Sequence, residues 1–180
     1  NKFKFSLNIE NSEVFKLLKE TTKKDLILDY SQLRISLLHL LNIALPKNAR
    51  IATTSYTIFD MINIILNSGK KPFFVDIEKE NLGPNRDQLI NLVINKKVDC
   101  IIYTYLHGYK CDIKNLSKVC KEYDCLLIED CAQSLWNSEN SITSLPGSFG
   151  DVALFSTGLY KNINSISGGL LCINSKHKIS

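Results

Sequence analysis

The sequence predicts an α/β protein folded as a three-layer sandwich, in which a mostly parallel central sheet lies between two layers of helices. The first observation is that apolar runs of four or five residues alternate with segments whose apolar residues recur at helical spacing. The second is that these runs are continuously apolar, as strands are when helices cover both faces of a parallel sheet. The 180 residues, 44% of them hydrophobic, suffice to bury such a core.

The expected helices and strands alternate, as right-handed crossovers between parallel strands require. Helices are predicted over residues 33–41, 58–66, 89–94 and 113–123, and strands over residues 50–53, 72–75, 98–103, 125–128, 152–155 and 170–173. Gly69 follows the second of these helices and Pro84-Asn85 precedes the third, which are typical stop and start signals.

The domain organisation is expected to be simple. Residues 1–24 are charged and weakly patterned, which predicts an N-terminal helical segment outside the sheet. Residues 25–180 contain no internal repeat and no low-complexity linker, so we expect them to form one domain.

Composition argues against several classes of function. The net charge is +4 and the lysines form no run of five or six, so neither a nucleic-acid nor a membrane partner is expected. No stretch reaches the about 18 apolar residues of a membrane span, and no signal peptide is visible, which predicts a cytoplasmic location. The six cysteines show no CxxC spacing, so we expect reduced thiols and no metal site.

A carboxylate follows one of the apolar runs. Asp130 comes after the strand over residues 125–128, at the carboxyl edge where ligands gather in such folds. A carboxylate in that place is costly unless a cation or several donors meet it. A helix N-cap is an equally good interpretation of Asp130, and Glu129 could do the same in a more exposed position.

A lysine lies in a short turn after another strand. The strand over residues 152–155 is followed at once by Ser156, and Lys161 comes five residues later, after Gly158. A lone lysine is usually a solvated surface group. A lysine held between two buried strands near a carboxylate is a candidate for Schiff-base chemistry.

These segments, LLIEDCAQS, GSFGDVALFSTGLYKN and GGLL, resemble the DegT/DnrJ/EryC1/StrS sugar-aminotransferase family. Earlier segments agree in order, so that the resemblance runs from about Leu33 to about Ile173. It implies the large, pyridoxal-phosphate-binding domain of a fold-type-I enzyme over residues 25–180. It also implies a smaller C-terminal domain, which we expect to be missing from these 180 residues.

The resemblance implies a role for each of four residues. Lys161 matches the lysine that forms a Schiff base with pyridoxal 5'-phosphate and later moves a proton. Asp130 matches the aspartate that pairs with the protonated ring nitrogen. Gln133 matches the side chain that hydrogen-bonds the phenolic oxygen of the ring, and Ser156 matches the hydroxyl that binds the phosphate.

The sequence departs from the family pattern at two further positions. Where relatives have Gly-Thr before the first helix of the sheet, this chain has Ser31-Gln32-Leu33-Arg34. Arg34 could pair with the phosphate, or could equally be an exposed residue of the first helical turn. Ile58 aligns where relatives often stack an aromatic ring on the cofactor.

The resemblance therefore implies an aminotransferase acting on a nucleotide-diphospho keto-sugar, in polysaccharide or cell-surface glycan biosynthesis. Glutamate or glutamine is the expected amino donor, and a homodimer the expected assembly. Relatives that dehydrate sugars carry histidine in place of the lysine, so Lys161 argues against that reaction. A second hypothesis is a degenerate, non-catalytic member that acts as a scaffold or partner subunit. A nucleotide-binding domain of another kind is disfavoured, because the chain has neither GxGxxG after its first strand nor GxxxxGK[ST].

Overall fold

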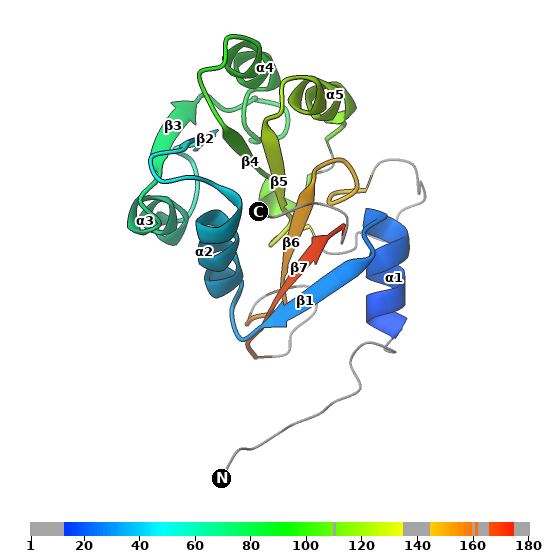
Figure 1. Cartoon of the computed structure of the whole chain (residues 1–180). Coiled ribbons are helices and arrows are strands. Elements are labelled where there is room, and N and C mark those ends of the chain that lie inside the picture. The colour runs from blue at the N-terminus through cyan, green and yellow to red at the C-terminus, as the bar shows by residue number, and fades with distance from the viewer. Residues whose placement is uncertain (1–12, 110, 135–144, 160, 162–165, 175–180) are drawn as a thin grey trace.

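The computed structural model describes residues 13–109, 111–134, 145–159, 161 and 166–174. Within them, a seven-stranded sheet has the strand order β1-β7-β6-β5-β4-β2-β3 (Figure 1). The strands are β1 (Leu26–Tyr30), β2 (Arg50–Thr54), β3 (Lys71–Val75), β4 (Cys100–Thr104), β5 (Leu126–Asp130), β6 (Val152–Ser156) and β7 (Gly169–Ile173). The helices are α1 (Glu13–Thr22), α2 (Leu33–Ala44), α3 (Phe59–Asn67), α4 (Arg86–Ile94) and α5 (Lys114–Glu122), and a 3₁₀ turn, η2, spans Leu106–Gly108. β7 runs antiparallel to both of its neighbours, and the other neighbouring strands are parallel.

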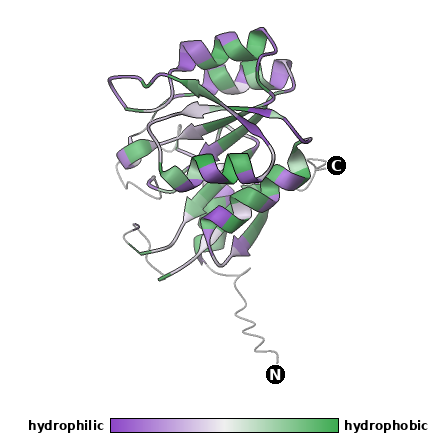
Figure 2. Cartoon of the chain, turned by 90° about the vertical axis from the view of Figure 1, so that its left-hand side faces the viewer, coloured by the Kyte–Doolittle hydropathy of each residue, from purple (hydrophilic) through white to green (hydrophobic). Residues whose placement is uncertain are grey.

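Two hydrophobic cores lie on the two faces of the sheet. Helices α2 and α3 cover one face, and α1, α4 and α5 cover the other (Figure 1). Hydrophobic and hydrophilic residues share the turns of the helices in Figure 2, so that one side of each helix packs on the sheet and the other meets solvent. This arrangement confirms the predicted three-layer α/β sandwich with a mostly parallel sheet.

Every helix and strand predicted for the sheet domain is present, with boundaries that differ by a few residues. Strand β5 runs on to Asp130, so that this carboxylate is the last residue of the strand. Strand β1 was not predicted, because only Ile27 of its five residues is buried and Asp29 interrupts the apolar pattern. It lies at the edge of the sheet, where its neighbour among the described strands is β7.

Helix α1 lies within the segment expected at the N-terminus, whose residues 1–12 fall outside the described part of the chain. Phe15, Leu18 and Thr22 are buried, and the two apolar side chains join the same core as α4 and α5. The helix therefore packs on the sheet.

Three observations bear on the expectations from composition. All six cysteines are buried and free of disulfides. In the described ranges, no group of three or more His, Cys, Asp or Glu side chains could hold a metal ion. No helix among the described residues has both the length and the apolar character needed to cross a bilayer.

Candidate functional site

A cavity of about 340 Å³ lies at the carboxyl edge of the sheet, on the face covered by α2 and α3. Two parallel strands end there, β5 with Asp130 and β6 with Ser156, and two helices begin there, α2 at Leu33 and α3 at Phe59. Its apolar lining includes Leu33, Leu37, Ile58, Met61, Ile64, Leu154 and Leu159, and its polar lining includes Gln32, Arg34, Asp60, Asp130, Ser156, Lys161 and Ser167. A largely apolar cavity with a few convergent charges is typical of a small-molecule site.

One wall of the cavity depends on a glycine. A Cβ atom on Gly169 would come within 2.4 Å of both the backbone nitrogen and the Cα of Leu33. Only a residue without a side chain allows the start of β7 to lie against the start of α2. The preceding Gly168 lines the cavity.

Asp130 lies almost completely buried in this cavity. Its Oδ1 accepts a hydrogen bond from the backbone N–H of Ala132 (N–O 3.1 Å), and its Oδ2 accepts a longer one from the hydroxyl of Thr104 (O–O 3.3 Å). Burial raises the pKa of Asp130, although these two donors and the nearby charge of Lys161 act in the opposite direction. The carboxylate is therefore under-compensated and would gain from a cationic partner.

Lys161 and Ser156 line the same cavity as Asp130. Ser156 continues the alternation of Val152 and Leu154, which places it on the same face of the sheet as Asp130. The backbone N–H of Lys161 donates to the carbonyl of Gly158 (3.2 Å), which holds the turn that carries the lysine. The structure thus brings together three of the residues expected from the sequence.

An ion pair lies in the lining of the cavity, between Arg34 in the first turn of α2 and Asp60 in the first turn of α3. The guanidinium Nη1 of Arg34 donates to Oδ2 of Asp60. The residues at the N-caps of the two helices, Gln32 and Ile58, make no side-chain capping hydrogen bond. Ile58 lines the cavity and is 62% exposed.

Gln133 is not among the residues that line the cavity, although Ala132 beside it in the chain is. Its Oε1 accepts a hydrogen bond from the backbone N–H of His107 (2.8 Å). His107 has φ 53° in the turn η2, so this bond helps to hold a left-handed backbone conformation.

The expectation that Glu129 is more exposed than Asp130 was wrong, because Glu129 is completely buried. Successive strand residues point to opposite faces, so Glu129 lies on the side of α1, α4 and α5. Its carboxylate accepts hydrogen bonds from the hydroxyl of Tyr105 (2.7 Å) and from the N–H groups of Gly147 (2.8 Å), Phe149 (2.8 Å) and Gly150.

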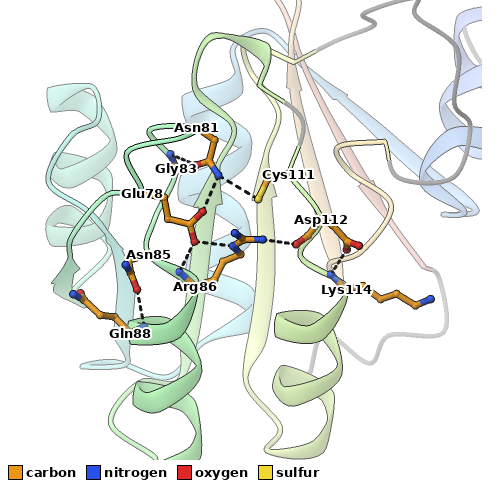
Figure 3. Close-up of polar contacts among 9 residues, drawn as sticks. All are labelled: Glu78, Asn81, Gly83, Asn85, Arg86, Gln88, Cys111, Asp112 and Lys114. Carbon is orange, nitrogen blue, oxygen red and sulfur yellow. Dashed lines mark hydrogen bonds and ion pairs between the residues drawn. The ribbon is translucent and has the colours of Figure 1, made fainter.

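A second polar cluster occupies the loops after β3 and β4, outside the cavity lining (Figure 3). Arg86 donates from Nε to Glu78 (2.7 Å) and from Nη1 to the carbonyl of Asp112 (3.0 Å). Asn81 donates to the other oxygen of Glu78 (2.7 Å). Burial opposes ionisation of Glu78, but the hydrogen bonds from Arg86 and Asn81 outweigh it and lower the pKa of Glu78.

Reasoning from the sequence missed two side chains at the cavity, Thr104 and Asp60, and it also missed the burial of Glu129. Thr104 directly follows a predicted strand, so strand register beside Asp130 could have found it. Asp60 lies in the first turn of a predicted helix, where an acidic residue usually needs no special explanation.

Comparison with known proteins supports the resemblance found in the sequence. The profile of the DegT/DnrJ/EryC1/StrS aminotransferase family matches residues 33–179. A GDP-perosamine synthase of Vibrio cholerae is 34% identical over 133 residues, which cover 74% of this chain and 35% of that protein. A GDP-perosamine synthase of Escherichia coli O157:H7 is 27% identical over 139 residues, covering 77% of this chain and 37% of that protein. The chain thus spans about a third of the length of these relatives.

Solved structures show the same fold. The GDP-4-keto-6-deoxy-D-mannose-3-dehydratase of E. coli, solved with bound hydrated PLP, has a TM-score of 0.77 at 19% identity, over 88% of this chain and 42% of that one. PseC of Helicobacter pylori, an aminotransferase involved in the biosynthesis of pseudoaminic acid, has a TM-score of 0.76 at 22% identity, over 89% of this chain and 43% of that one. These likenesses confirm the predicted fold, that of fold-type-I pyridoxal-phosphate enzymes.

Proposed function

Because this chain belongs to the DegT/DnrJ/EryC1/StrS aminotransferase family, we propose that it is the cofactor-binding part of an enzyme that transfers an amino group to a nucleotide-linked keto-sugar. The names of the relatives support a nucleotide-sugar substrate, since two of them are GDP-perosamine synthases. The chain spans about a third of those proteins, so the activity is proposed for the complete gene product. Residues 25–180 are proposed to form its large domain.

One observation carries the proposal: Asp130 at the end of β5, and Ser156 and Lys161 at and just after the end of β6, line a single cavity. A packed core has no use for a buried carboxylate with only two donors, beside a lysine and a hydroxyl. Arg34 and Ile58 line the same cavity, as expected for contacts with a phosphate and with a ring face.

The residues present fit pyridoxal 5'-phosphate. Asp130 is a buried anion that would gain from the protonated nitrogen of a pyridine ring. Ser156, Arg34 and the start of α2 supply donors for a phosphate group. When bound, the cofactor supplies an aldehyde that takes up amino groups and a ring that accepts electrons from the reacting carbon.

Each side chain then has a task that suits its chemistry. Lys161 would hold the cofactor covalently through Nζ and, once released, would carry a proton on that same atom. Asp130 would keep the ring nitrogen protonated, and Thr104 would hold the carboxylate in place through its hydroxyl. Gln133 is proposed to contact the phenolic oxygen, although its Oε1 already binds the N–H of His107.

The finer assignments rest on the family resemblance. We propose glutamate or glutamine as amino donor, a homodimer and a cytoplasmic location. Amination is favoured over dehydration because the chain has Lys161 where dehydratases of the family carry histidine.

A non-catalytic role as scaffold or partner subunit is the second candidate, and two observations favour it. The guanidinium of Arg34 contacts Asp60, and the position expected to hold a stacking aromatic is Ile58. Both features suggest a weaker cofactor site than the one proposed above.

The decisive experiment adds pyridoxal phosphate to the complete gene product, reduces it with borohydride and maps the labelled peptide. We expect a visible absorption band that borohydride bleaches, with the label on Lys161. Lys161→Ala should lose both the band and the label while its unfolding midpoint stays close to that of the wild type. Lys118→Ala, which removes an exposed lysine of α5, is the matched control and should behave as wild type.

Two results would count against the proposal. Failure of the wild-type protein to acquire the band at saturating cofactor would favour the non-catalytic role. A label that persists in Lys161→Ala would show that another lysine holds the cofactor.

A further inference from the structure

The Arg34–Asp60 ion pair places a carboxylate where the proposed function needs an anionic ligand. Both side chains line the cavity, and the pair joins the first turns of two helices whose N-caps lack side-chain caps. Guanidinium groups bind phosphate and carboxylate oxygens with the same N–H donors. Asp60 therefore occupies a donor of Arg34 that a phosphate group could use.

The charges that line the cavity balance. Within the described residues the lining holds two cationic side chains, Arg34 and Lys161, and two anionic ones, Asp60 and Asp130. Lys161 and Asp130 belong to the proposed chemistry of the ring. Without Asp60, the phosphate end of the cavity would carry the full positive charge of Arg34.

We propose that the carboxylate of Asp60 binds Arg34 before a ligand arrives, and that the phosphate of the ligand must displace it. Asp60 thereby lowers the affinity of the cavity for phosphate. Asp60 is thus a positioning residue that acts through Arg34. The identification of the ligand as the cofactor phosphate rests on the proposed function, whereas competition for Arg34 concerns any phosphate-bearing molecule in this cavity.

The exposure of the pair determines how large the effect should be. The side chains of Arg34 and Asp60 are 55% and 42% exposed, so solvent screens their attraction. Exposed ion pairs contribute little to stability, and a dianionic phosphate can replace the carboxylate. We therefore expect Asp60→Asn to tighten phosphate binding by roughly two- to five-fold.

The experiment measures dissociation constants by calorimetry for inorganic phosphate and for pyridoxal phosphate, on the complete gene product. Asp87→Asn is the matched control, because Asp87 is the second residue of the nine-residue helix α4, as Asp60 is of the nine-residue helix α3. The two substitutions remove the same charge from the same helical position, but Asp87 lies outside the cavity lining.

Whether Asp60 acts through Arg34 is tested with Arg34→Met and the double variant Arg34→Met/Asp60→Asn. The gain from Asp60→Asn should disappear when Arg34 is absent, and Asp60→Glu should bind phosphate as weakly as the wild type. An unchanged or weaker affinity in Asp60→Asn would overturn the inference. An equal gain with and without Arg34 would also overturn it, because general repulsion would then suffice.

The same data separate this inference from the proposed function. A label on Lys161 together with no effect of Asp60→Asn would leave the function standing and remove the role of Asp60. Tighter binding of inorganic phosphate in Asp60→Asn, with no label on Lys161 in the wild type, would support the role of Asp60 and contradict the proposed function.

Discussion

Two neighbouring carboxylates of β5, Glu129 and Asp130, face opposite sides of the sheet and have opposite environments. Glu129 receives four donors from the protein itself. Asp130 receives two, one of them long, and burial raises its pKa. A carboxylate that the chain satisfies by itself stabilises the fold, whereas one left under-compensated in a cavity is suited to a ligand.

The surroundings of Glu129 form a closed polar network. The loop over residues 147–150 places three N–H groups on its carboxylate. A Cβ on Gly150 would meet the carbonyl oxygen of Leu127 at 2.7 Å, so only glycine lets the loop come this close. Lys24 is also buried and donates to the carbonyl of Gly147 (2.7 Å). Burial lowers the pKa of Lys24, and the charge of Glu129 acts in the opposite direction.

The largest effect on stability is expected from Glu129→Ala. The substitution leaves the hydroxyl of Tyr105 and three loop N–H groups without their acceptor, and it removes a negative charge that raises the pKa of the buried Lys24. Removing one member of such a buried network costs about 3–5 kcal/mol, which urea-induced unfolding would measure. Glu122→Ala, at an exposed position of α5, should change the free energy of unfolding by less than about 0.5 kcal/mol. Similar changes in the free energy of unfolding for the two variants would show that Glu129 does not stabilise the fold as proposed.

Asp130→Asn tests the role of the carboxylate that lines the cavity. A neutral amide cannot hold a ring nitrogen protonated, so we expect amino transfer by the complete gene product to fall by about 100-fold or more. The rate of keto-acid formation from glutamate in the presence of the cofactor would measure this. Turnover close to that of the wild type would mean that Asp130 only caps the turn at Ala132.

The stability of the cofactor-free protein is the control for Asp130→Asn. The folded-state pKa of Asp130 lies above its ordinary value of 3.8, so the ionised carboxylate disfavours folding near neutral pH. This cost is relieved as the pH falls through the folded-state pKa. The variant should therefore unfold at no lower urea concentration than the wild type at pH 7, and the difference should shrink on acidification.

A smaller effect is expected in the cluster of Figure 3, which resembles the Glu129 network in being closed. Glu78→Gln should destabilise the protein by about 1 kcal/mol, because Arg86 loses a charged acceptor. The pKa of Glu78 is lowered, so its contribution is present above its ordinary pKa of 4.5 and is lost as the pH falls through the folded-state value. Urea unfolding curves of the wild type and Glu78→Gln, measured from pH 7 downward, should therefore differ most at pH 7, and the difference should shrink as the pH falls below 4.5. A difference that persists at the lower pH would indicate lost packing.

Much of the fold follows from local pattern, because a strand buried on both faces must be continuously apolar. Strands β4, β5 and β6 were found in this way, and with them the positions of Asp130 and Ser156 at strand ends. Lys161 was found through the spacing that it shares with its family. The pairing of Arg34 with Asp60 could not be found, because it depends on how two helices lie across a cavity.

The edge strand β1 and the burial of Glu129 were missed for related reasons. β1 has one buried side chain and owes its existence to pairing with β7. Glu129 is compatible with burial only because a loop 18–21 residues further along the chain brings its donors. Both the pairing of β1 and the burial of Glu129 depend on residues far away in the sequence. A pattern read from neighbouring residues therefore cannot predict them.

The pairing of β1 with β7 has a consequence for the order in which the protein assembles. Leu26 lies opposite Ile173, so β1 can pair with its neighbour only after β7 has been synthesised. A chain emerging from the ribosome can join β2, β3, β4 and β5 while β1 still lacks β7, its neighbour among the described strands. Closing a loop of this length is slow compared with local helix formation. Completion of the sheet, and with it the wall where Gly169 meets Leu33, is therefore expected to be a late step of folding.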